Sequence, residues 1–208
     1  SILKGGAGDD VLTSTETDFD SLIGGPGADA LIGSGFSGNF AAMTRAVYSN
    51  STSPISLEIS SAGIINNTTS GDGVGDTFDN IRSIQGSNQG DYFEFTDIDG
   101  MAIWAGSGAD TFALSPGGSI NAQIIYFDAT EDRFDLSRYP GLSFEDITVG
   151  DFIANDSGNQ DTLFSIYVID VQGTITEENF IFGSGISATA YESLRQYLGI
   201  TDGATCVY

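Results

Sequence analysis

The chain has 208 residues, 40% of them hydrophobic, and its 29 acidic and 6 basic side chains give a net charge of -23. This charge repels nucleic acid and anionic membrane surfaces, so we expect a cation as partner, and neither nucleic acid nor a membrane. The sequence contains no histidine, which excludes Ser-His and Cys-His hydrolysis and the common histidine sites for zinc and haem. The single cysteine, Cys206, has no intrachain disulfide partner, and no apolar run reaches the roughly 18 residues of a membrane span.

In chain order, the first feature is a nine-residue repeat. It begins with GGAGDDVLT at 5–13, continues with TETDFDSLI at 15–23 and GGPGADALI at 24–32, and returns with GSNQGDYFE at 86–94, TDIDGMAIW at 96–104 and AGSGADTFA at 105–113. The sixth position of these units is Asp10, Asp20, Asp29, Asp91, Met101 and Asp110. The eighth position is Leu12, Leu22, Leu31, Phe93, Ile103 and Phe112. The repeat therefore includes both an acidic position and an apolar position expected in the core.

Each unit predicts a Gly-rich turn of about six residues followed by a strand of about three, whose central apolar side chain points inward. The strands are expected to alternate between two sheets of parallel strands, so two units complete one coil. The first and third units of each block would then lie on the same edge, with aspartates 19 residues apart. One inserted residue in each block, Ser14 or Phe95, accounts for the offset.

Stacked turns on one edge would bring carboxylates of neighbouring coils together with turn carbonyls, and glycine lets these carbonyls point inward. Such a set of hard oxygen ligands suits Ca²⁺ better than Mg²⁺. We therefore expect metal sites formed by Gly5, Gly6, Gly8, Asp9, Asp10, Asp20, Gly24, Gly25, Gly27, Asp29, Gly86, Asp91, Gly106, Gly108 and Asp110. The second edge departs from the pattern, because Asp20 lacks turn glycines and Met101 cannot bind a hard cation.

These units resemble the calcium-binding nonapeptide GGxGxDxUx of the RTX family. Residues 5–13 and 24–32 match every fixed position, and 86–94 and 105–113 match most of them. The stretch at 47–87 also resembles the spacer between repeat blocks in that family, and IIYFDATEDRFDLS at 124–137 resembles the segment that closes such rolls. The resemblance implies an all-β fold, a parallel β-roll over residues 1–137. It also implies type I secretion through an uncleaved C-terminal signal, and hence an extracellular protein.

Within this roll we expect repeat blocks at 4–35 and 86–114 and a spacer at 36–85. In the spacer, ISLEIS at 55–60 alternates as a half-buried strand does. GDGVGDTFDNI at 71–81 has acidic spacing typical of a metal site, but Asp76 and Asp79 could equally be turn and capping residues.

Beyond residue 137 the pattern changes to longer strands. FEDITVGDFI at 144–153 and TLFSIYVIDV at 162–171 predict a hairpin, and GTITEENFIF at 173–182 predicts a further short strand. TAYESLRQYLG at 189–199 predicts an amphipathic helix over 189–198, which packs on the strands or docks on another subunit. Residues 138–208 would thus form a C-terminal β cap and a tail that holds the secretion signal.

Every strong motif serves metal binding or the fold, so we expect a structural module and not an enzyme. The first hypothesis is a calcium-dependent extracellular module of a cell-surface layer, adhesin or fibre subunit. Its first coil, SILKGG, is the tail of a repeat and could contact another subunit in a homo-oligomer or filament. The alternative is the non-catalytic folding and secretion module of a longer lipase, protease, epimerase or lyase, which an upstream catalytic domain would indicate.

Overall fold

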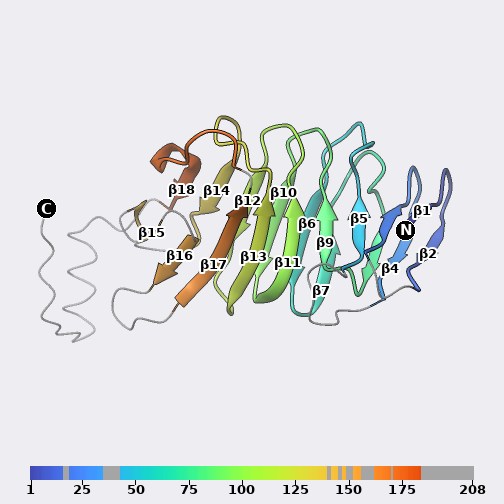
Figure 1. The fold of residues 1–208 in the computed structure, drawn as a ribbon, viewed down its shortest axis with the longest axis horizontal. Helices are drawn as coiled ribbons and strands as arrows, with labels where there is room; N and C mark the ends of the chain where they lie inside the picture. The colour runs from blue at the N-terminus through green and yellow to red at the C-terminus, as the bar shows by residue number, and fades with distance from the viewer. Residues whose placement is uncertain are drawn as a thin grey trace, which may run out of the picture.

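The computed structural model describes the chain except residues 16–18, 35–42, 140–141, 145–146, 149–151, 156–161, 170 and 184–208. The described part is almost entirely β-strand, and its one named helix is the 3-10 helix η3 (Glu177–Asn179). Figure 1 shows the strands standing side by side along the long axis, with the N-terminal strands at one end. In this described part, no helix is long and apolar enough to cross a membrane.

Two layers of strands face each other across the core. The nine-stranded sheet has the order β1 (Ile2–Lys4), β3 (Ser21–Ile23), β5 (Arg45–Val47), β9 (Ser83–Gln85), β11 (Ile98–Trp104), β13 (Ile120–Ile125), β17 (Thr162–Ile169), β16 (Phe152–Asn155) and β15 (Ile147–Thr148). The second layer consists of a three-stranded sheet, β2 (Val11–Thr13), β4 (Ala30–Ile32) and β8 (Thr77–Asp79), and a six-stranded sheet. The latter has the order β18 (Phe180–Phe182), β14 (Arg133–Leu136), β12 (Thr111–Leu114), β10 (Tyr92–Thr96), β6 (Ser56–Ser60) and β7 (Gly63–Asn66). None of the sheets closes on itself.

Most neighbouring strands are parallel, and the register follows the repeat. Ile2 pairs with Ser21, Val11 with Ala30 and Tyr92 with Thr111, which is an offset of 19 residues each time. The prediction that the first and third units of a block lie side by side is therefore confirmed. The antiparallel pairs are β6–β7, β15–β16 and β16–β17.

The predicted strand length of three residues holds for the first block and is wrong for the second. Strands β1 to β4 each have three residues, whereas β10 has five, β11 seven and β12 four. The longer strands contain additional buried apolar residues such as Phe95 and Ile98, which extend the core beyond the repeat's single inward position.

The core is formed by the eighth position of each unit, as the repeat predicts. Leu12, Leu22, Leu31, Phe93, Ile103 and Phe112 are all at most 5% exposed. In the six-stranded sheet these positions form a column of aromatic rings, in which Phe112 lies 5.7 Å from both Phe93 and Phe134. Burial of such large side chains supplies most of the driving force for packing the two layers together.

The spacer contributes strands to all three sheets. Strands β5 and β9 continue the nine-stranded sheet, β8 pairs with β4, and β6 pairs ahead with β10. The half-buried strand predicted at 55–60 is confirmed, because Ile55, Leu57 and Ile59 are each 1% exposed. Between β6 and β8, the antiparallel strand β7 brings the chain back toward the first block.

The C-terminal strands extend both layers. Strand β17 pairs with β13 and β18 pairs with β14, both in parallel. The single strand expected at 144–153 is instead two short strands, β15 and β16, which pair with each other in antiparallel fashion. The helix predicted over 189–198, the tail and the hairpin loop at 156–161 lie outside the described residues.

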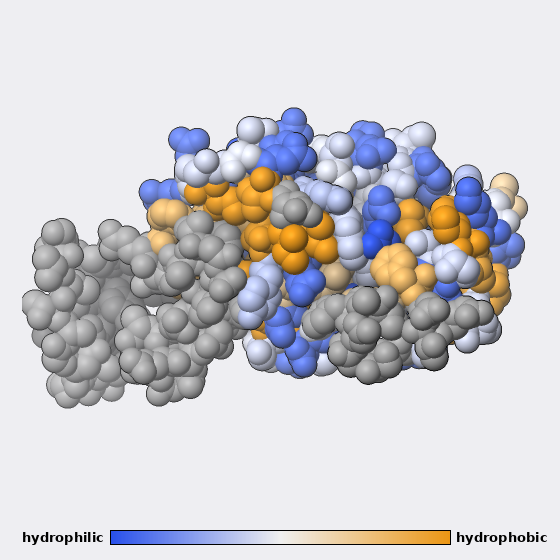
Figure 2. Space-filling model, in the orientation of Figure 1, coloured by the Kyte–Doolittle hydropathy of each residue, from blue (hydrophilic) through white to orange (hydrophobic). Residues whose placement is uncertain are grey.

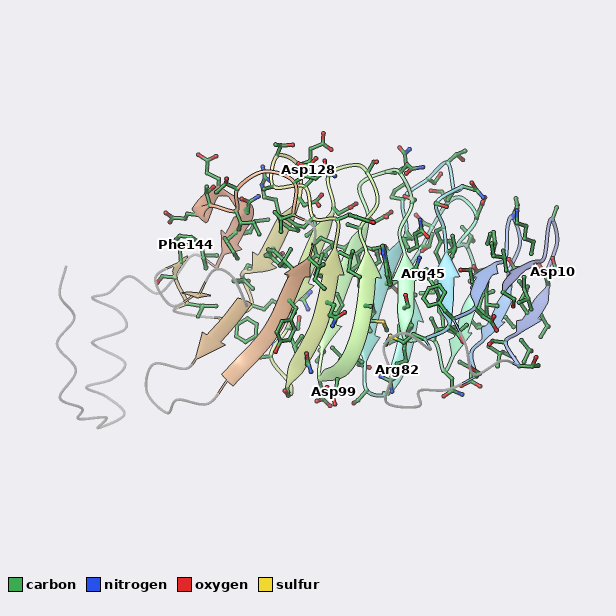
Figure 3. The ribbon with its side chains drawn as sticks, viewed as in Figure 1. Asp10, Arg45, Arg82, Asp99, Asp128 and Phe144 are labelled. Atoms are coloured by element: carbon green, nitrogen blue, oxygen red, sulfur yellow. The ribbon has the colours of Figure 1, made fainter. Side chains whose placement is uncertain are left out.

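The outer face of the nine-stranded sheet carries a cation between two aromatic rings. The guanidinium of Arg45 lies 3.3 Å from the ring centre of Trp104 and 4.5 Å from that of Phe19. Beside Trp104, Met43, Ala102 and Ile125 form a small second apolar cluster. Figure 2 shows hydrophobic patches among hydrophilic residues on the face it presents, and Figure 3 labels Arg45. Burial lowers the pKa of Arg45 to about 10, so this guanidinium still carries its charge at neutral pH.

Candidate functional site

Aspartates of successive coils are linked by hydrogen bonds along one edge of the second layer. The main-chain N–H of Asp10 donates to Oδ1 of Asp29 (2.8 Å), and the N–H of Asp29 donates to Oδ1 of Asp76 (2.8 Å). We call Asp10, Asp29 and Asp76 the first ladder. Each of them precedes a strand of the three-stranded sheet by one residue, so the parallel pairing of β2, β4 and β8 sets their spacing.

A second ladder repeats this arrangement in the six-stranded sheet. The N–H of Asp91 donates to Oδ1 of Asp110 (2.8 Å), and the N–H of Asp110 donates to Oδ1 of Asp132 (2.9 Å). Asp91, Asp110 and Asp132 are each 1% exposed. Figure 3 shows Asp128, which donates its N–H to Oδ2 of Asp132 (2.8 Å), at the opposite edge from Asp99.

Three carboxylate oxygens of the ladders have no hydrogen-bond partner. Among the described residues, Oδ2 of Asp10, of Asp29 and of Asp110 is buried and accepts no hydrogen bond. Burying a charged oxygen without a partner is costly, so native proteins usually pair such atoms with a donor, a water or an ion. Within the described part of the chain, these three atoms are therefore the best candidates for metal ligands.

The unpaired oxygens belong to the repeats with glycine at both the second and the fourth turn position. These glycines are Gly6 and Gly8, Gly25 and Gly27, and Gly106 and Gly108, and all six have positive φ. A positive φ is costly for other residues, so the sequence can form this turn only with glycine here. The turn before Asp91 differs, because Ser87 and Gln89 occupy the same positions.

The glycines also allow the turns to stack closely. A Cβ at Gly25 would overlap with the carbonyl oxygen of Gly6, and a Cβ at Gly27 would overlap with that of Gly8. At the first turn position, a Cβ at Gly24 would overlap with Oδ2 of Asp29. A side chain at any of these positions would thus overlap with a main-chain carbonyl or with the carboxylate of Asp29.

Three other predicted turn residues, Gly5, Gly86 and Asp9, also contact ladder carboxylates or neighbouring turns. A Cβ at Gly5 or Gly86 would also overlap with the carboxylate of its own repeat, that of Asp10 or Asp91. Asp9 is exposed and its Oδ1 accepts a hydrogen bond from the N–H of Ala28 (2.9 Å). Its carboxylate therefore joins two neighbouring turns from outside the ladder.

Asp20 lies on the other edge and joins neither ladder. Its carboxylate accepts hydrogen bonds from the hydroxyls of Ser1 (2.6 Å) and Ser14 (2.5 Å). Hydrogen bonding, first by the amino group of Ser1 and then by these hydroxyls, lowers the pKa of Asp20 to about 2. Met101, the corresponding residue of the second block, is 1% exposed and packs in the core. On this edge, the structure thus places hydroxyl donors around Asp20 and an apolar side chain, Met101, at the corresponding position of the second block.

Burial raises the pKa of five carboxylates in the ladders. Desolvation is the largest cause in each case, and it raises the pKa of Asp110 to about 9 and the pKa values of Asp76 and Asp132 to about 6. The pKa values of Asp29 and Asp91 are raised for the same reason. For Asp29 and Asp110, whose Oδ2 accepts no hydrogen bond, the protein alone does not compensate the negative charge, and a bound cation would.

Sequence reasoning left Asp76 open and did not single out Asp132. The nine-residue frame would have found both, because it places Asp76 and Phe78 at the sixth and eighth positions of 71–79. In the same way, 127–135 has Asp132 and Phe134 at these positions. The signal was weak because the first turn glycines of the second stretch are absent.

The donor set fits a hard cation bound mainly by carbonyl groups. Within the described ranges, no three acidic side chains gather into one metal-binding group. A cation at an unpaired oxygen would therefore be held by carboxylate oxygens of a ladder together with turn carbonyls. Ca²⁺ accepts such a set, because it takes six to eight oxygens in flexible geometry, about 2.3–2.6 Å away.

We compared the sequence with known protein families and with curated proteins. No family matches the chain, and no curated protein matches it either.

Proposed function

We propose that this chain is a calcium-dependent extracellular structural module, folded as a parallel β-roll similar to those of RTX proteins and belonging to a cell-surface layer, adhesin or fibre subunit. The observation that carries the proposal is the set of three buried, unpaired carboxylate oxygens in the ladders. They occur in the turns that have positive-φ glycines at the second and fourth positions. This combination supports binding of a cation with a preference for oxygen ligands.

The proposed mechanism is folding controlled by calcium. Without metal, stacked carboxylates repel one another and lose their hydration in the folded state. With metal, the free energy of binding adds to the free energy of folding. At a hundredfold excess over the dissociation constant, each ion contributes about 2.7 kcal/mol, so two or three ions match the lower part of the usual 5–15 kcal/mol range of domain stability.

This mechanism suits a protein that acts outside the cell. Extracellular calcium modules bind with dissociation constants of about 10⁻⁴ to 10⁻³ M. At the much lower calcium concentration inside a cell, such sites stay empty and the chain stays unfolded until it is exported. The net charge of -23 also favours a cation over anionic partners.

The test is sedimentation velocity of the 208-residue chain with about 5 mM calcium, a few times the weakest expected dissociation constant, and again with chelator. Far-ultraviolet circular dichroism on the same samples reports strand content. We expect a compact or self-associating species with calcium and an expanded monomer with chelator. Identical profiles in both conditions would contradict calcium-dependent folding.

The same experiment separates the two biological settings. Polymers in calcium support the surface-layer or fibre subunit. A compact monomer in calcium supports the alternative, a folding and secretion module of a longer enzyme, because such a module needs no contact between copies.

A further inference from the structure

The two ladders do not continue into each other, although their sheets are neighbours in the second layer. Leu57 pairs with Phe93, so Ile55, two residues before Leu57, lies opposite Asp91, two residues before Phe93. An aspartate in place of Ile55 would extend the second ladder. The N–H of Ile55 donates to Oδ1 of Asp91 (2.9 Å), as the N–H of a ladder aspartate does. Ile55 is 1% exposed and offers no carboxylate. The second ladder therefore ends at Asp91 on this side.

The last aspartate of the first ladder has a protein donor where Asp10 and Asp29 have none. The hydroxyl of Tyr48 donates to Oδ2 of Asp76 (2.7 Å). Tyr48 is 3% exposed, and its ring packs edge-on against Phe78, 6.4 Å away between centres. The hydroxyl is thus held in place by the core of the spacer.

The first aspartate of the second ladder is satisfied in a similar way. Ser87 donates its N–H to Oδ2 of Asp91 (2.7 Å) and its hydroxyl to Oδ1 (2.7 Å). In the first block the residue at the same turn position, Gly6, donates its N–H to the carbonyl of Gly24 instead (2.9 Å). The serine side chain at this position therefore adds a hydroxyl donor that glycine cannot supply.

From these contacts we infer that Tyr48 and Ser87 close the facing ends of the two ladders, occupying the oxygens of Asp76 and Asp91 that would otherwise face a metal ion. The array is then divided into two separate metal-binding blocks. This inference rests on the proposed function, since it assigns which ladder positions bind calcium. The physical reason is that a carboxylate oxygen with a short hydrogen bond from a buried donor has no need of a cation.

The experiment counts calcium ions per chain by isothermal titration calorimetry in wild type, Tyr48→Phe and Tyr92→Phe. Tyr92 is the matched control, because its hydroxyl donates to Glu94 (3.2 Å), outside both ladders. Removing the Tyr48 hydroxyl leaves Oδ2 of Asp76 without its donor. We expect Tyr48→Phe to bind one ion more than wild type and to melt with a steeper dependence on calcium. Tyr92→Phe should bind the wild-type number.

Ser87→Gly gives a second measurement that does not depend on the folding of the tyrosine variant. It removes the hydroxyl that donates to Oδ1 of Asp91 and places glycine at this position, as in the turns with Gly6, Gly25 and Gly106. We expect it to bind one additional ion as well. If neither Tyr48→Phe nor Ser87→Gly binds more calcium than wild type, the closing role is refuted while the proposed function stands. If wild type itself binds no calcium, both are refuted.

Discussion

The unpaired oxygen of Asp110 predicts a substitution whose effect depends on calcium. Asp110→Asn keeps the shape of the side chain and the acceptor for the N–H of Asp91, 2.8 Å away. It removes the charge and the buried Oδ2 that has no partner. We expect this variant to be more stable than wild type without metal and to gain less stability from calcium.

Without metal, the magnitude follows from the pKa. Burial raises the pKa of Asp110 to about 9, whereas an unfolded aspartate has a pKa of about 3.9. At pH 7 the folded chain must bind a proton that the unfolded chain does not, which costs about 1.36 kcal/mol for each of about three pH units, or about 4 kcal/mol. The asparagine amide has its own burial cost of about 1–3 kcal/mol, so the net gain is roughly 1–3 kcal/mol.

With calcium in hundredfold excess, the loss of one site costs about 2.7 kcal/mol. For a domain of this size, 1 kcal/mol shifts the melting temperature by about 2–4 °C. Asp110→Asn should therefore raise the melting temperature in chelator by roughly 2–12 °C. Calcium should raise the melting temperature of wild type by roughly 5–11 °C more than that of the variant. The lost response to calcium is the distinguishing feature.

The assay is thermal unfolding followed by circular dichroism, with and without calcium at pH 7. Asp79→Asn is the control, because Asp79 is exposed at the end of β8 and its substitution should change stability by no more than about 0.5 kcal/mol. An equal shift of Asp110→Asn relative to wild type under both conditions would show that Oδ2 of Asp110 does not face a metal.

Three further predictions concern the turns, the pH dependence and the core. Gly24→Ala places a Cβ against Oδ2 of Asp29 and should cost about 1–3 kcal/mol in calcium, measured by urea unfolding; a wild-type midpoint would contradict the close packing. In calcium-free buffer, stability should fall as pH rises from 4.5 to 8, because burial raises the folded pKa values of Asp76 and Asp132 to about 6. Their contribution to the free energy of unfolding is complete below the unfolded pKa of about 3.9 and is lost as pH rises through about 6. Melting temperatures that rise with pH would refute this. Phe112→Ala, within the column of rings, should cost about 3–5 kcal/mol, and a loss below 1 kcal/mol by urea unfolding would contradict its place in the core.

Much of the first block could be predicted from sequence because its repeat is local. The turn 5–10 and the strand after it lie within nine residues, and glycine at the second and fourth positions permits the positive φ that the turn requires. The same spacing that places Asp10 and Asp29 at the sixth positions also places Leu12 and Leu31 at the eighth positions, which are buried in the core. These features depend only on residues that are close in the sequence, so they can be predicted without knowing which strands pair.

The spacer was the least predictable part, because its strands find partners far along the chain. Asp76 accepts the N–H of Asp29, 47 residues earlier, and the hydroxyl of Tyr48, 28 residues earlier. Nothing in the local sequence shows that β6 pairs ahead with β10 while β8 pairs back with β4. The sequence therefore could not show whether Asp76 is a turn residue or a metal ligand, because this depends on which strands pair in the folded chain.

What the sequence alone determined is the unit: a glycine turn, an acidic sixth position and an inward eighth position, since their spacing and backbone conformation are properties of nine consecutive residues. What only the tertiary structure decided is which units become neighbours, and hence which carboxylates remain unpaired. Oδ2 of Asp29 has no partner, whereas Oδ2 of Asp76 accepts the Tyr48 hydroxyl, although both residues occupy the same repeat position. Hydrogen-bond satisfaction depends on the donors that folding brings within about 3 Å, and these donors come from elsewhere in the chain.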